Sequence, residues 1–204
     1  MAGRAPVGDH RRTMPVELIA FTADRRIRGM IPLADDRLSD MLNSVPRVVV
    51  RRAEIDDLVN GAPTEMADVT LTVGSIVAVL VVGRRGVENR RRKTEVHRAR
   101  IGLNRFVVSG LLHVPVGATD RLASVDPAVV LAGRDILVPL TDATITYDKA
   151  DQPTTERFET ILVNRAYATW IDLDDAASGD DSEFVGERPK VYHAAMAKDF
   201  TRAS

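Results

Sequence analysis

Short runs of alternating apolar and polar residues, separated by turn residues, cover most of the chain. A period of two places every second side chain on the same face of a strand, which is typical of a sheet with one buried face. Val and Ile are frequent in these runs, and their branched side chains favour extended backbone. The pattern therefore predicts a mostly-β protein with little helix.

In the first part of the chain, the alternation predicts five strands, at 16–22, 26–33, 47–55, 68–73 and 75–82. A short helical turn is predicted between strands at 36–43, because Asp35 or Asp36 can accept the free N–H groups at its start. The stretch 58–67 contains Pro63 and other turn residues, so it is predicted as a turn.

The second part of the chain repeats this layout. Strands are predicted at 94–101, 105–114, within 134–147, and at 158–163 and 165–173. A weaker helical turn is predicted at 120–124, and 148–155 is predicted as a turn because it is polar and contains Pro153. Five strands and a short helix thus recur in the same order.

Individual segments also match between the two parts. The segment 26–33, with Gly29 inside it, matches 107–114, with Gly110 inside it, and 73–80 matches 163–170. Self-similarity of this kind indicates an internal duplication and fixes the architecture before any detail of the strands.

The duplication and the changes in composition predict five regions along the chain. These are a flexible arm at 1–15, a first β-barrel unit at 16–83, a basic linker at 84–93, a second β-barrel unit at 94–173, and an acidic tail at 174–204 with a terminal helix at 191–200.

The order of elements in each unit resembles the Sm-like small barrel, in which a strongly bent sheet closes on itself. The segments Ile27-Arg28-Gly29-Met30-Ile31 and Thr72-Val73-Gly74-Ser75-Ile76-Val77 carry this resemblance. It implies two tandem small bent-sheet barrels, with Gly29 and Gly110 at the bends, where the lack of a Cβ permits close approach. The first unit also resembles an uncharacterised bacterial domain family with an Arg-Leu-Ser-Asp-x-Leu-Asn stretch, here at 37–43.

Sm-like barrels bind RNA through Asp, Asn and basic side chains that face the centre of a ring. The resemblance therefore implies Asn43, Asn164 and Arg165 as candidate nucleic-acid contacts. Fold alone does not assign a function, so this implication needs support from the site itself.

The composition narrows the function classes. The chain has no cysteine, which excludes disulfides, thiolate nucleophiles and Cys-ligated metals. The net charge of −1 gives no overall attraction to nucleic acid or to anionic membranes. The longest apolar run, 76–82, is far shorter than the roughly 20 residues that span a bilayer. We expect a soluble, cytoplasmic protein without a membrane partner.

A basic stretch is the sharpest local feature of the sequence. It contains Arg84, Arg85, Arg90, Arg91, Arg92 and Lys93, followed by Arg98 and Arg100. Guanidinium groups match phosphate oxygens, so the stretch is a candidate for RNA or DNA binding. A solvated linker is the alternative, because only Phe106 lies close enough in sequence to stack on bases.

No set of nucleophile, base and orienting group is visible, so an enzyme is not expected. The acidic residues from Asp172 to Glu183 lack the Gly of a calcium loop, and no metal or cofactor site is predicted. The sequence favours a non-catalytic binding or assembly module that contacts a protein partner, or itself, through strand edges. The alternatives are an RNA- or DNA-binding regulator that uses the basic stretch and a small-molecule sensor.

Overall fold

The computed structural model describes residues 14–33, 37–82, 94–115, 133, 135–175 and 192–193. Strands account for most of these residues, and the described part contains a single short α-helix. The predicted mostly-β class is therefore confirmed. The arm, the basic linker, the predicted helical turn at 120–124 and most of the acidic tail lie outside the described residues.

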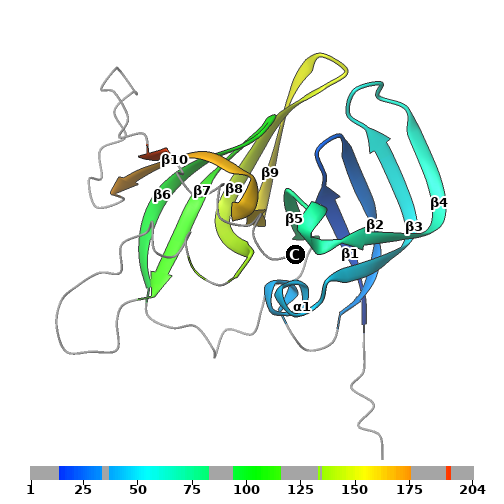
Figure 1. Ribbon diagram of the computed structural model, residues 1–204, viewed down its shortest axis with the longest axis horizontal. Coiled ribbons are helices and arrows are strands. Elements are labelled where there is room, and N and C mark those ends of the chain that lie inside the picture. Colours follow the sequence, from blue (N-terminus) through cyan, green and yellow to red (C-terminus); the bar gives the residue numbers. More distant parts are fainter. Residues whose placement is uncertain are drawn as a thin grey trace, which may run out of the picture.

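The first half of the structure consists of five strands and one helix (Figure 1). In chain order, these are β1 (Met14–Phe21), β2 (Arg25–Leu33), α1 (Leu38–Ser44), β3 (Arg47–Asp57), β4 (Pro63–Thr72), the 3-10 turn η1 (Val73–Ser75) and β5 (Ala78–Val81). The helix lies where the sequence predicted it. Its N-cap is Arg37, which makes no side-chain capping bond.

The described residues of the second half repeat the five strands and the 3-10 turn, and add a short final strand. It contains β6 (Thr94–Leu103), β7 (Phe106–Pro115), β8 (Leu137–Lys149), β9 (Gln152–Asn164), the 3-10 turn η3 (Arg165–Tyr167), β10 (Ala168–Asp175) and β11 (Tyr192–His193). The predicted terminal helix at 191–200 is wrong at Tyr192 and His193, because both residues pair with β10 as a strand.

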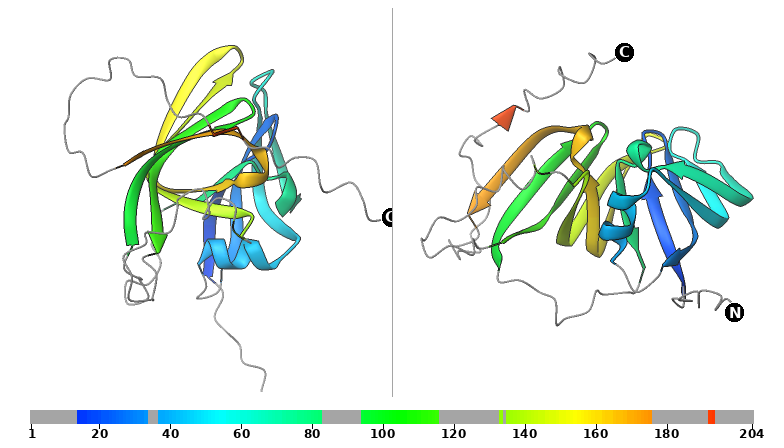
Figure 2. Two further views of the ribbon diagram at one scale, coloured as in Figure 1. Left: turned by 60° about the vertical axis from the view of Figure 1, so that its left-hand side comes forward. Right: turned by 60° about the horizontal axis from the view of Figure 1, so that its bottom comes forward.

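All strands belong to one antiparallel sheet with the order β11-β10-β6-β7-β8-β9-β5-β1-β2-β3-β4. In each half, the last of the five strands lies beside the first. The two halves are joined because β5 pairs with β9, with Ala78 opposite Val163 and Val79 opposite Leu162. The sheet is not closed, and it continues through β5 into the second half (Figure 2).

Gly29 lies at a β-bulge, as the sequence predicted for a bend in β2. The β2–β3 register shifts here, because Arg28 lies opposite Glu54 but Met30 lies opposite Arg51. Strand β3 therefore has one extra residue at the bulge, and Arg52 within it has a φ of 50°. A Cβ on Gly29 would lie 2.6 Å from Cγ1 of Val50. Only glycine fits here without a shift of the neighbouring strand.

Gly110 occupies the equivalent bulge in the second half. The β7–β8 register shifts between Ser109 and Leu111, and Asp142 in the facing strand has a φ of 47°. A Cβ on Gly110 would lie 3.0 Å from the Cβ of Ala143. The duplication seen in the sequence is thus also present in the local geometry of these bulges.

The hydrophobic core is shared between the halves. Phe21 and Leu58 from the first half belong to the core cluster of the second, whereas Leu162 from the second half belongs to that of the first. The ring of Phe21 packs against Phe106 and Tyr147, with centroid distances of 5.8 and 5.4 Å. Neither core is complete without residues from the other half.

Two predicted strands begin several residues earlier in the structure than expected. Strand β4 begins at Pro63 and β9 at Gln152, so the turn predicted at 148–155 is reduced to Ala150 and Asp151, which have φ values of 48° and 59°. Residues 63–68 of β4 are exposed on both faces, and in β9 the less exposed residues Thr154 and Glu156 are polar, so the alternation of apolar residues that marks a buried face is absent from both segments.

The sequence alignment of the closing segments was also wrong by two residues. It matched Val73 with Val163, but Val73 begins η1 whereas Val163 still lies in β9. The counterpart of Val73 is Arg165, which begins η3. The error arose because apolar residues alternate on both sides of the turn, so the pattern alone does not fix the register.

Candidate functional site

Asn43, a candidate nucleic-acid contact, lies at the junction between the halves. Its Oδ1 accepts a hydrogen bond from the N–H of Leu137 at 3.0 Å, and its Nδ2 donates to the carbonyl of the same residue at 3.3 Å. Helix α1 contacts β8, which brings the Asn43 side chain to the start of that strand. The amide therefore joins the two halves through backbone groups, and its role in nucleic-acid binding stays a prediction.

Asn164 is fully buried at the same junction. Its Nδ2 donates to the carbonyl of Ile76 at 2.7 Å, and its Oδ1 accepts from the N–H of Ala166 at 3.0 Å. The backbone N–H of Asn164 donates to Val77, and that of Arg165 donates to Ile136. Both asparagines predicted as nucleic-acid contacts thus use their amide groups to bind backbone groups where the two halves meet.

A network of charged residues connects the halves at another position. Lys149 lies 3.2 Å from Asp56, Arg26 lies 3.6 Å from Asp56, and Arg26 also lies 3.2 Å from Glu156. Arg26 and Asp56 come from β2 and β3, whereas Lys149 and Glu156 come from β8 and β9. The cluster contains two cationic and two anionic side chains. It therefore forms an ionic contact between the halves.

Tyr147 completes the network from the core side. Its side chain is buried, and its hydroxyl donates to Oε1 of Glu156 at 2.5 Å. Burial raises the pKa of Tyr147 well above its ordinary value, and the hydrogen bond to Glu156 adds to the effect. The phenol therefore stays protonated and serves as a hydrogen-bond donor throughout the neutral range.

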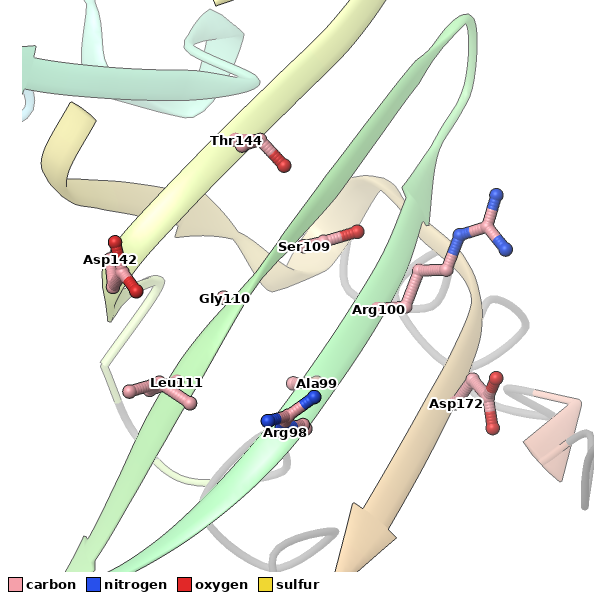
Figure 3. A pocket seen from close by; sticks show the side chains of 9 residues that line it. All are labelled: Arg98, Ala99, Arg100, Ser109, Gly110, Leu111, Asp142, Thr144 and Asp172. Carbon is pink, nitrogen blue, oxygen red and sulfur yellow. The ribbon is translucent and has the colours of Figure 1, made fainter. Parts of the chain in front are cut away.

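The basic stretch predicted to bind nucleic acid is only partly described. Arg84, Arg85, Arg90, Arg91, Arg92 and Lys93 lie outside the described residues. Arg98 and Arg100 lie on β6, two positions apart, so their side chains project from the same face. They line an open depression of about 490 Å³ on the second half (Figure 3).

A row of polar side chains crosses this depression. Asp172, Arg100, Ser109 and Thr144 lie opposite one another on β10, β6, β7 and β8 (Figure 3). Near the edge of the depression, Asp142 accepts two hydrogen bonds from Arg157, one at 2.6 Å. The surface offers guanidinium and hydroxyl donors to an anionic or polar ligand, but its two carboxylates offset part of the positive charge.

Trp170 lies on β10, two residues before Asp172, which lines the depression. The guanidinium of Arg100 lies 5.7 Å from the centre of the indole ring. Gly102 lies opposite Trp170 across the strand pair, and a Cβ on Gly102 would overlap the ring. This half-buried aromatic side chain was missed by the sequence reasoning, although it is the only Trp in the chain.

The two ends of the sheet are the remaining candidate surfaces, with β4 at one end and β10, next to the two-residue strand β11, at the other. Within the described part of the chain, β4 pairs only with β3, and its residues are mostly exposed. At the other end, β11 covers β10 only at Trp170 and Ile171. Both strands therefore present backbone hydrogen-bonding groups that a further strand can use.

The direction of these groups on β4 follows from its pairing. Arg47 lies opposite Thr72, and the N–H of Val73 donates to the carbonyl of Pro46 at 2.9 Å. Thr72 is therefore at a position that is not hydrogen-bonded to β3, and by alternation Thr70 is another. The N–H and C=O of Thr70 point away from β3, toward the open edge.

Comparisons with family models, with curated proteins and with solved structures found no match to this chain. What the Sm-like resemblance implies for fold and RNA binding therefore stays a prediction. Among the described residues, no helix is long and apolar enough to cross a membrane.

Proposed function

We propose that this protein is a non-catalytic binding or assembly module that engages another protein, or itself, through the edges of its sheet. The pairing of β5 with β9 carries the proposal, because it joins an outer strand of one half to an outer strand of the other. The same kind of contact is available to a further strand at β4 and β10. The lack of a catalytic set in the sequence supports the non-catalytic assignment.

The composition of β4 supports a controlled rather than an indiscriminate contact. Pro63, Glu65 and Asp68 lie along this strand, and proline and charged residues on an edge limit non-specific pairing. The stretch from Val69 to Thr72 contains neither proline nor a charged residue. A partner strand would therefore add at this end of β4, where the backbone groups of Thr70 point outward.

We also propose that each half derives from one small barrel-like unit of the Sm-like type. The repeated strand order supports this origin, and so do the equivalent bulges at Gly29 and Gly110. Each half then corresponds to a unit built to share its outer strands with a neighbour, which is how β5 and β9 are used within the chain.

The function can be tested with two variants of one edge residue. Thr70→Pro removes an N–H that points away from β3, so the fold should be retained while strand addition is blocked. Thr70→Val keeps the N–H and a similar shape. We expect immobilised wild-type and Thr70→Val protein to retain partner protein from an extract of the source cells, and Thr70→Pro to lose it. Equal retention by all three proteins would contradict the proposal.

Nucleic-acid binding is a second candidate function, favoured by the position of Arg98 and Arg100. Their side chains share one face of β6, and β6 directly follows the basic stretch in the sequence. An RNA strand could contact the stretch and continue onto this face, where Trp170 could stack on a base.

This second candidate predicts a salt-dependent interaction. Fluorescence anisotropy with labelled single-stranded RNA should give an affinity that falls steeply as salt is raised. Replacement of Arg98 and Arg100 by Gln should weaken binding and reduce the salt slope. Unchanged affinity in this variant and in one with Arg90, Arg91 and Arg92 replaced by Gln would exclude both basic segments.

A further inference from the structure

We propose that the depression on the second half binds a small molecule through a terminal phosphate group. The phosphate would lie between Arg98, Arg100 and Ser109, beside the bulge at Gly110. This site goes beyond the proposed strand-edge contact, because it uses a face of the sheet and not an edge. The two halves differ in charge at this place, and the difference identifies the kind of ligand.

The bulge glycines make the surroundings of the depression comparable with the first half. Gly29 lies opposite Leu18, and Gly110 lies opposite Ala99. Leu18 and Ala99 are therefore counterparts, and so are the residues before and after them on β1 and β6. The strand that follows the glycine strand aligns in the same way, because both registers shift at the glycine.

Four positions on one face surround each bulge, and they come from the first three strands of each half. In the first half these positions are occupied by Glu17, Ile19, Arg28 and Glu54. In the second half they are occupied, in the same order, by Arg98, Arg100, Ser109 and Thr144. The two sets have no residue type in common, so the duplication has preserved the backbone here but not the chemistry.

In the first half, an ion pair within the chain occupies this place. Nε of Arg28 donates to Oε1 of Glu17. Glu54 lies opposite Arg28 on β3 and adds a second negative charge. The four positions thus carry two carboxylates and one guanidinium, and the cation has its anions within the chain.

In the second half, the same four positions carry two guanidinium groups, two hydroxyl groups and no carboxylate. Among the side chains that the structure describes, neither Arg98 nor Arg100 forms an ion pair. Ser109 stands where Arg28 pairs with Glu17 in the first half. An anion from solution would therefore take the role that the carboxylate of Glu17 has in the first half.

Three of these side chains are close enough to contact one ligand group. Arg98 and Arg100 are two residues apart on β6, so their Cα atoms are separated by about 6.8 Å. Ser109 lies directly opposite Arg100, about 4.5–5.5 Å away across the strand pair. The hydroxyl of Ser109 points toward β6 (Figure 3). Both arginines are exposed, so their guanidinium groups can turn onto a ligand without breaking an ion pair.

Trp170 positions Arg100 for this contact. The guanidinium lies 5.7 Å from the centre of the indole ring. The indole in turn packs on Gly102, where a Cβ would overlap it. A guanidinium stacks on a ring through its face and still donates hydrogen bonds from its edge. The stacked Arg100 has fewer conformations to lose when a ligand binds.

A terminal phosphate matches this set of groups better than other anions. At neutral pH it carries a charge of about −1.5 to −2 and has three strong acceptor oxygens, which two guanidinium groups and one hydroxyl can satisfy. A carboxylate has two oxygens and one charge, and each phosphate of a nucleic-acid strand also has one charge. The depression has a volume of about 490 Å³, within the roughly 300–1,000 Å³ typical of small-molecule sites.

The carboxylates of the depression determine where the phosphate lies. Asp142 is bound to Arg157, which offsets its charge. Asp172 lies opposite Arg100 on β10, so its charge repels an anion on that side. The phosphate would therefore lie toward Ser109 on β7. Removal of the charge on Asp172 should strengthen the binding of an anion, whereas it would weaken a ligand that donates hydrogen bonds to this carboxylate.

An NMR titration of the full-length, ¹⁵N-labelled protein tests the site with two matched probes. Methyl phosphate is a terminal phosphate, and dimethyl phosphate has one charge and one fewer free oxygen. We expect methyl phosphate to shift the amide signals of residues 98–100 and 109–110. Dimethyl phosphate should bind about threefold more weakly or worse, because it loses one charge-assisted hydrogen bond.

Four variants test the assigned residues. Arg98→Gln and Arg100→Gln should each weaken the binding of methyl phosphate about threefold or more, and Asp172→Asn should strengthen it. Arg47→Gln removes an exposed arginine of β3 and is the matched control, which should bind as the wild type does. Thr70→Pro should also bind methyl phosphate normally, so failure of this site and failure of the edge contact are distinguishable.

Three results would overturn the inference. These are the absence of shifts at the named amides, equal binding of the two probes, and a loss in Arg47→Gln as large as that in Arg98→Gln. Weaker binding in Asp172→Asn would assign the depression to a ligand of another class. If single-stranded RNA binds through Arg98 and Arg100 while methyl phosphate does not, the face serves nucleic acid and the small-molecule site is excluded.

Discussion

Asn43 binds both backbone polar groups of Leu137, with its Oδ1 on the N–H at 3.0 Å and its Nδ2 on the carbonyl at 3.3 Å. The two residues belong to different halves, and each hydrogen bond uses one end of the same amide. Leu137 is buried, so water cannot easily replace a lost partner. This relationship gives α1 a structural role at the junction of the halves.

Asn43→Leu should therefore destabilise the protein. The change leaves the N–H and C=O of Leu137 without their partners, which costs about 1–3 kcal/mol for a buried group. Urea denaturation measures the change in the free energy of unfolding. Asp40→Asn on the exposed side of the same helix is the control, and it should change the stability by less than about 0.5 kcal/mol. Equal effects of the two substitutions would show that the amide contributes nothing.

The loss of stability caused by alanine substitution at three glycines should depend on the space available for the added Cβ. Gly29→Ala should be the most destabilising, because its Cβ would lie 2.6 Å from Val50 and 2.8 Å from the carbonyl of Arg51. Gly110→Ala should cost less, because its contacts begin at 3.0 Å, and Gly74→Ala should be nearly neutral, with nothing within 4 Å. Overpacking typically costs about 1–3 kcal/mol. Thermal unfolding measures the order, and a Gly74→Ala variant as unstable as Gly29→Ala would contradict it.

Tyr147 should make the stability fall at alkaline pH. Burial and the bond to Glu156 raise its pKa in the folded state. Above about pH 10, the unfolded chain releases the phenol proton while the folded chain keeps it, so stability falls with rising pH. Below that pH the contribution is fully present. The urea midpoint of Tyr147→Phe should therefore decline less with alkaline pH than that of the wild type; parallel declines would assign the effect elsewhere.

Strand β11 should compete with association. It pairs His193 with Trp170 and Tyr192 with Ile171, so it occupies the outer edge of β10 at these two residues. Replacing both Tyr192 and His193 by Pro removes the N–H groups of β11 and should release the edge. We expect this variant to associate at lower concentration than the wild type in sedimentation experiments. Weaker association would mean that β11 supports the contact instead of blocking it.

Much of the fold was predictable from local pattern. Alternating apolar residues predicted the strands, and the Sm-like resemblance implied bends at Gly29 and Gly110, where the structure has bulges. These features depend on interactions between near neighbours in sequence. The outer parts of β4 and β9 were missed because neither shows a period of apolar residues: residues 63–68 of β4 are exposed on both faces, and Thr154 and Glu156 on the less exposed face of β9 are polar.

The joining of the halves was not predictable in the same way. The apolar run at 76–82 is typical of a strand covered on both faces, but it does not say which strand covers it. The roles of Asn43 and Asn164 were equally hidden, because an amide suits a base and a backbone group equally well. Only the position of each side chain in the folded chain distinguishes these uses.

The pairing of β5 with β9 also has a consequence for biosynthesis. The ribosome makes the chain from its N-terminus at about 5–20 residues per second, so β1 to β5 emerge several seconds before β9 exists. During that interval, Ala78 and Val79 lack the strand that covers them in the finished protein. On a polysome, the β9 nearest to such a nascent chain belongs to a neighbouring chain that is further advanced, and exchange of strands between siblings then competes with correct folding.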